Sequence, residues 1–168
     1  QKPVSDYADI MEKAFYNTVL GGMQRDGKRF DYVNPLECIP GISGVAVTHR
    51  HDLTTRPGWY ACACCPPNLA RLIASLGKYL WSEDEGTVYS HLFIGSEVET
   101  RYGRISMTSG YPWEGKAEYT IHDGGDFALT IHVPQHAVKV SLHVNGEEVS
   151  NVTADGYCRI QRNWQQDD

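Results

Sequence analysis

Apolar residues recur at the three- and four-residue spacing of a one-faced helix in two segments of the chain. The first segment starts at Ser5 or Asp6, either of which can cap a helix, and Gly21-Gly22 ends it. The second segment covers residues 69–81, and Pro67 suits a first helical position. We therefore expect two amphipathic helices, with apolar positions at Tyr7, Ile10, Met11, Ala14, Phe15, Thr18 and Val19 in the first and at Leu69, Leu72, Ile73, Leu76, Leu80 and Trp81 in the second.

The chain between these helices predicts a hairpin and then a long loop. Asp26-Gly27 separates two short arms, residues 23–25 and 28–33, which is the usual signal for a tight hairpin turn. Residues 34–60 are rich in proline and glycine and show no sustained period. Long loops of compact proteins are often functional, so this loop is a place to look for site residues.

After the second helix, the pattern changes to the alternation of β-structure. A polar segment at residues 82–86 marks the boundary, and short apolar or alternating runs follow between Gly, Asp and Asn turns. Seven such runs suggest an antiparallel β-sandwich, at residues 88–94, 98–102, 104–108, 117–122, 127–133, 138–144 and 157–160. The predicted fold class is α+β, with a helical segment at residues 1–82 and a sandwich domain at residues 83–168, incomplete at its end.

Composition narrows the functional classes. The chain has 168 residues, a net charge of −6 and no basic stripe, so nucleic acid is not an expected partner. No apolar stretch approaches the length that crosses a bilayer, so we expect no membrane insertion. Five cysteines, three of them clustered, fit a reducing compartment or a metal site better than a disulfide framework, and we expect a cytoplasmic protein. Both ends look abrupt, so we expect a segment of something larger.

Three thiols lie within four positions, at Cys62, Cys64 and Cys65, just before the second predicted helix. A disulfide between adjacent cysteines closes a small, strained ring, whereas two adjacent thiolates can bind one soft metal ion. The positive end of a helix also favours a thiolate, which can then ligate or attack. Buried structural thiols are the alternative interpretation for the Cys64–Cys65 pair, and packing is the preferred one for Cys62.

The string Tyr60-Ala61-Cys62-Ala63-Cys64-Cys65-Pro66-Pro67-Asn68-Leu69-Ala70-Arg71-Leu72, preceded by Tyr32-Val33-Asn34-Pro35-Leu36-Glu37, closely resembles glycoside hydrolase family 127, the β-L-arabinofuranosidases. The resemblance implies that the helices and hairpin are the last part of an (α/α)6 barrel, followed by a β-sandwich. It also implies a zinc ion, with Cys64 as the nucleophile that touches the metal and Cys65 as a zinc ligand. Two further zinc ligands in the family form a Glu-x-Cys motif, which these 168 residues do not contain.

Other candidates for sugar contact lie in the hairpin and the loop. Tyr32 belongs to the matching segment and is expected to hydrogen-bond the sugar or the sulfur. His49 and His51 can ligate metal or contact hydroxyl groups, with exposed loop histidines as the alternative. Trp59, beside Tyr60, can stack on a sugar ring, with core packing as the alternative.

The resemblance implies a retaining, zinc- and cysteine-dependent glycoside hydrolase whose substrate is a carbohydrate with terminal β-L-arabinofuranosyl or related sugars, and we expect this chain to be inactive as an isolated fragment. Two rival hypotheses stay open at this point. One is a non-catalytic zinc module closed by Cys38, Cys62, Cys64 and Cys65, and the other is a carbohydrate-binding sandwich. Helices taken from a barrel leave apolar faces without partners, so a homo-oligomer is also expected, through residues such as Ile10, Phe15, Leu72 and Leu76.

Overall fold

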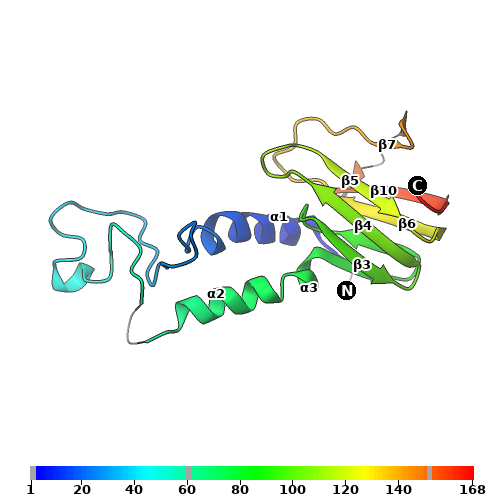
Figure 1. The fold of residues 1–168 in the computed structure, drawn as a ribbon. Coiled ribbons are helices and arrows are strands. Elements are labelled where there is room, and N and C mark those ends of the chain that lie inside the picture. Colours follow the sequence, from blue (N-terminus) through cyan, green and yellow to red (C-terminus); the bar gives the residue numbers. More distant parts are fainter. Residues whose placement is uncertain (1–2, 60–61, 151–152) are drawn as a thin grey trace. The chain divides into compact units, whose positions relative to one another are not determined.

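The computed structural model describes residues 3–59, 62–150 and 153–168, and it shows a mixed α+β chain with more sheet than helix (Figure 1). The predicted α+β class is confirmed. The chain forms two compact units, one made of Glu12–Ala74 and the other of Gln1–Met11 with Ser75–Asp168. Over the described residues, no helix is both long enough and apolar enough to cross a membrane.

The first helix ends where its glycines predict. Helix α1 (Ser5–Lys13) continues as a π-helical turn, η1 (Ala14–Val19), closed by the Leu20 N–H donating to the carbonyl of Phe15 at 2.9 Å. The chain then passes so close behind this turn that a Cβ at Gly21 would lie 2.0 Å from the carbonyl oxygen of Asn17. Only glycine tolerates that approach, which explains why the helix ends here.

The hairpin after η1 is present in reduced form. Met23 and Phe30 make an isolated antiparallel bridge, and the Gln24 N–H donates to the carbonyl of Arg29 at 2.8 Å. Gly27 has a φ of +72°, a conformation that the turn requires and glycine adopts without strain. The loop that follows is irregular, as predicted, apart from the 3-10 turn η2 (Val47–His49).

The second predicted helix is corrected at both ends. Helix α2 (Cys65–Ala74) begins before Pro67, and a separate short helix, α3 (Gly77–Leu80), follows it. Trp81 starts a strand instead of ending a helix, because it pairs with Ser90 of a neighbouring strand. Leu80 is 5% exposed and belongs to the unit made of Gln1–Met11 and Ser75–Asp168, which we call the β-rich unit. From this residue on, burial in that unit determines the structure, and the helical spacing of apolar residues no longer does.

Two sheets form most of the second unit. The larger has the strand order β1-β2-β6-β10-β9, made of β1 (Trp81–Asp84), β2 (Thr87–Ser90), β6 (Gly125–His132), β10 (Tyr157–Trp164) and β9 (Thr153–Ala154). The smaller has the order β3-β4-β5, made of β3 (Ser96–Thr100), β4 (Gly103–Ser109) and β5 (Ala117–Ile121). A short ribbon joins β7 (His143–Val144) to β8 (Glu147–Glu148).

The predicted antiparallel arrangement is wrong for one pair, because β2 and β6 run parallel, with Val88 opposite Leu129. The chain leaves β2, builds the whole β3-β4-β5 sheet and only then returns as β6. A connection of that length is what a parallel pair needs, whereas a tight turn produces an antiparallel one. The larger sheet is therefore mixed.

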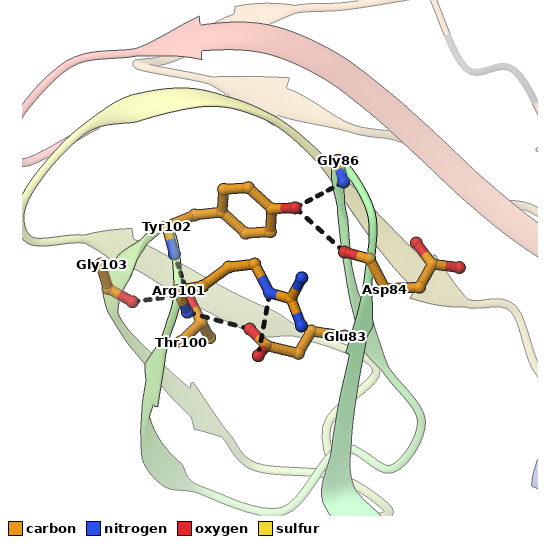
Figure 2. A network of polar contacts seen from close by, with 7 residues as sticks. All are labelled: Glu83, Asp84, Gly86, Thr100, Arg101, Tyr102 and Gly103. Atoms are coloured by element: carbon orange, nitrogen blue, oxygen red, sulfur yellow. Dashed lines mark hydrogen bonds and ion pairs between the residues drawn. The ribbon is translucent and has the colours of Figure 1, made fainter.

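Buried side chains from both sheets form one core, with Val88, Ile105 and Phe127 at 0% exposure. A polar network also joins the turns at one end of the two sheets, as Figure 2 shows. The Tyr102 hydroxyl donates to the Asp84 carbonyl at 3.0 Å and accepts from the Gly86 N–H, while Arg101 pairs with Glu83 at 3.2 Å. Apolar packing and this network together hold the smaller sheet on the larger one.

Candidate active site

The thiol pair sits at the start of α2, where the sequence places it. Cys64 is the N-cap, since its carbonyl accepts the N–H of Asn68 at 3.3 Å and the Asn68 side-chain amide at 3.0 Å. Arg71 donates to the Asn68 side-chain oxygen at 3.2 Å and so fixes that side chain one turn further along. The first turn of α2 therefore holds the backbone beneath both sulfur atoms.

The two sulfur atoms lie 3.5 Å apart but in different surroundings. Cys64 is exposed, whereas Cys65 is half-buried and its Sγ lies 3.9 Å from the carbonyl oxygen of Tyr32. Hydrogen bonds from the thiols of Cys65 and then Cys62 lower the pKa of Cys64, while burial and then the Cys64 thiol raise the pKa of Cys65. The geometry thus makes Cys64 the accessible thiol of the pair.

The structure brings the backbone carbonyl of Tyr32, a residue far from the thiols in sequence, to within 3.9 Å of Cys65 Sγ. The residue is half-buried at the end of the hairpin, directly after Asp31. Asp31 donates its N–H to the carbonyl of Gly22 at 2.7 Å and pairs with Arg56 at 3.4 Å. The sequence suggested no role for Arg56, because its partners lie far away along the chain.

The other candidates occupy the loop. The Nδ1 of His49 lies 2.9 Å from the hydroxyl of Thr48, and His51 is exposed. Trp59 is 63% exposed, so core packing does not account for it within this unit. Its predicted neighbour Tyr60 lies outside the described residues. Roles for His49, His51 and Trp59 in sugar contact stay predictions.

The thiol pair fits two positions of a zinc site. Two sulfur ligands at ~2.3 Å from a tetrahedral zinc are about 3.8 Å apart, and the observed separation is 3.5 Å. Within residues 3–59, 62–150 and 153–168, no three His, Cys, Asp or Glu side chains come together as a metal-binding group. The Cys38 thiol instead lies 3.8 Å from the carbonyl of Leu53, so the hypothesis of a closed four-cysteine module lacks structural support.

Two family models match the chain in succession. Residues 1–78 match the catalytic domain of GH127 beta-L-arabinofuranosidase, and residues 87–168 match the GH127 middle domain. The catalytic-domain match covers the thiol pair, and the middle-domain match covers every strand of the sheets except β1, which lies in the gap between the two matches.

Relatives agree with these matches. The chain is 43% identical over 149 residues to the non-reducing end beta-L-arabinofuranosidase of Bifidobacterium longum subsp. longum, covering 86% of this chain. A crystal structure of a GH127 beta-L-arabinofuranosidase from Geobacillus stearothermophilus T6 superimposes with a TM-score of 0.89 at 39% identity over 99% of this chain. A second GH127 beta-arabinofuranosidase structure gives 0.77 at 27% identity over 97% of the chain.

The chain is much shorter than these relatives. It spans 21% of the Bifidobacterium protein, and it covers 27% of each of the two solved structures.

Proposed function

The chain belongs to glycoside hydrolase family 127, and from this we propose that it carries the nucleophile of a retaining hydrolase acting on terminal β-L-arabinofuranosyl residues. The proposal takes the substrate class from what the relatives are named for. It places residues 1–82 at the end of an (α/α)6 barrel and residues 83–168 in the following sandwich domain. It also assigns the complete site to a protein longer than these 168 residues.

The observation that carries the proposal is the exposed Cys64 thiol at the N-terminus of α2, with a second thiol 3.5 Å away. Free cysteines that only fill space are usually buried, as Cys158 is at 3% exposure. A sulfur that is open to solvent, beside a helix N-terminus and a neighbouring thiol, is instead placed to react with a ligand. Carbohydrate is the ligand class that the family match supplies.

The reaction requires one thiolate as the nucleophile and one carboxylic acid as the proton donor. The Cys64 thiolate attacks the anomeric carbon, the bond from that carbon to the leaving oxygen breaks, and a glutamic acid gives its proton to the departing oxygen. The resulting thioglycoside is then hydrolysed by water, which the same carboxylate deprotonates. Two inversions at the anomeric carbon give net retention.

Cys64 and Cys65 are the residues of this chain that would hold a zinc ion, together with ligands from elsewhere in the protein. When bound, zinc keeps the ligating thiols deprotonated near neutral pH. The chain's own contribution is to hold the two sulfur atoms together at the start of α2 and to leave Cys64 exposed.

The test is Cys64→Ser in the protein at its full natural length, assayed with a chromogenic β-L-arabinofuranoside. A serine hydroxyl is a poorer nucleophile and a weaker zinc ligand, so we expect kcat to fall at least about 1000-fold. Cys38→Ala is the matched control, because that thiol is exposed in the same unit and faces the carbonyl of Leu53. Its kcat should stay within about twofold of wild type.

A second measurement tests the covalent step directly. Protein quenched during turnover of a slow substrate should carry one added pentosyl group, and peptide mapping should place that group on Cys64. Substantial activity in the Cys64→Ser enzyme, or a pentosyl group found on a carboxylate, would reject the thiolate mechanism.

A further inference from the structure

Arg56 connects two parts of its unit that are far apart in sequence. Its guanidinium donates twice to the carbonyl of Gly21, from Nε at 3.1 Å and from a terminal nitrogen. The same Nε lies 3.4 Å from the Oδ2 of Asp31. One loop side chain therefore holds the end of the first helix and the second arm of the hairpin together.

The loop backbone next to Arg56 strengthens the same junction. The Phe30 N–H donates to the carbonyl of Pro57 at 3.0 Å, so the hairpin arm contacts the loop at Phe30 as well as at Asp31. Asp31 is 20% exposed and Arg56 is 37% exposed at their side chains, which makes the pair partly shielded from water. Two fork donors on one carbonyl, with the charge of the guanidinium beside a carboxylate, form a geometry that the planar arginine side chain makes and that lysine does not reproduce.

This junction includes Asp31, the residue directly before the one that contacts the thiol pair. Tyr32 follows Asp31 directly, and its carbonyl oxygen is the group that Cys65 Sγ faces at 3.9 Å. Only the ψ of Asp31 and the φ and ψ of Tyr32 separate the Tyr32 carbonyl from Asp31, so fixing Asp31 by its side chain and by its N–H narrows the positions that this carbonyl can take. The path of contacts runs from Arg56 through Asp31 and Tyr32 to Cys65.

We propose that Arg56 is a positioning residue of the thiol site, which holds Tyr32 against Cys65 and so keeps Cys64 the more accessible sulfur of the pair. The proposal rests on the function proposed above, because it assumes that the thiol pair is the reacting centre. It adds a residue that never touches the sulfur atoms and that works through the hairpin.

Thiol alkylation of the 168-residue chain tests the positioning without any need for turnover. Iodoacetamide is added for increasing times at fixed pH, and tandem mass spectrometry measures the rate at each cysteine. In wild type, Cys64 should react faster than Cys65, and buried Cys158 should stay slow. In wild type, the local opening that uncovers Cys65 has to break the charge-assisted contacts of Arg56. Arg56→Gln lacks these contacts, so the ratio of the Cys65 rate to the Cys64 rate should rise about tenfold.

Two variants make the result specific. Asp31→Asn removes the other half of the ion pair and should raise the same ratio. Arg25→Gln removes an exposed arginine from the same hairpin and should leave the ratio at the wild-type value. Where Arg56→Gln fails to fold, as shown by loss of the helical circular dichroism to which α2 of the same unit contributes, Arg56→Lys replaces it. Lysine keeps the positive charge beside Asp31 but lacks the planar fork that bonds the Gly21 carbonyl twice, so its ratio should lie between wild type and Asp31→Asn.

Kinetics in the protein at full natural length provide the functional readout. Misplacing a reacting group by about 1 Å can cost ~100-fold in rate, so Arg56→Gln should lower kcat by about that factor while KM changes far less. An unchanged Cys65-to-Cys64 ratio in a folded Arg56→Gln chain overturns the positioning role, whatever the activity. Absence of arabinofuranosidase activity in wild type overturns the proposed function and leaves the alkylation test standing.

Discussion

His91 is expected to make the stability of the β-rich unit depend on pH. This residue comes directly after β2, and both of its ring nitrogens make hydrogen bonds. The Nδ1 lies 2.9 Å from the hydroxyl of Tyr157 and the Nε2 lies 2.7 Å from the hydroxyl of Ser82. The ring also stacks on Tyr89 at an interplanar angle of 7°. Burial, and then the neighbouring His132, lower the pKa of His91 from 6.5 to about 4. The folded state therefore keeps this imidazole neutral.

The sign follows from proton binding. Between the two pKa values the unfolded chain binds a proton at His91 and the folded chain does not, so the free energy of unfolding falls as pH falls. The contribution is fully present above about pH 6.5 and is lost as pH drops toward about 4. The linkage relation gives a loss of ~2 kcal/mol in the free energy of unfolding between about pH 7 and about pH 5. This is an upper value, because the ring is only half-buried.

The assay is urea unfolding followed by tryptophan fluorescence. Trp81, Trp113 and Trp164 lie in the β-rich unit, so the signal reports mainly on that unit. In His91→Gln the free energy of unfolding should fall by ~2 kcal/mol less than in wild type between about pH 7 and about pH 5. His143→Gln, at an exposed histidine of β7, should keep the wild-type slope.

The comparison cancels the contribution of the carboxylates. Glu83 and Asp168 have lowered pKa values, from the hydrogen bonds that they accept from the backbone of Arg101 and of Gln165, and they destabilise every variant alike at low pH. Parallel curves for wild type and His91→Gln across this range would refute the reasoning, because they would mean that His91 is protonated as easily in the folded unit as in the unfolded chain.

Two further predictions concern the core and the polar network of this unit. Phe127→Ala removes a ring at 0% exposure that packs on Tyr102 and Trp164, so the free energy of unfolding should fall by about 3–5 kcal/mol; Val138→Ala, at a fully exposed position, should change it by less than about 0.5 kcal/mol in the same urea titration. Tyr102→Phe deletes the hydroxyl drawn in Figure 2 and should cost about 1–2 kcal/mol, and a cost near zero would mean that water replaces both contacts.

Features set by neighbouring residues were predictable from the sequence. The Asp26-Gly27 turn, the stop at Gly21 and the cysteines at a helix start all depend on backbone geometry within a few residues. The α+β class was predictable for the same reason, since the change from helical spacing to alternation is a local pattern. The thiol separation also belongs here, because adjacent cysteines cannot be far apart.

Features set by distant partners were not predictable in this way. Trp81 fits the helical spacing of the residues before it, yet pairing with Ser90 and a hydrogen bond from its indole to Ser96 at 3.0 Å make it a strand residue. The opposite error occurs at residues 138–144, where alternation predicts a strand and only β7 (His143–Val144) forms. Val138 is fully exposed, and alternation makes a strand only where another strand is present to pair.

The candidate site also contains both kinds of feature, those set by neighbouring residues and those set by distant partners. Cys64 and Cys65 are found by sequence because covalent adjacency and a helix start bring them together, and no substitution in the loop changes that. What the loop controls is which thiol is covered, since the group that faces Cys65 is a backbone carbonyl. A backbone contact leaves no residue-type signature, and Arg56 reaches Gly21 across 35 positions. Sequence can therefore identify the sulfur atoms of such a site, whereas the residues that orient them emerge only from the folded loop.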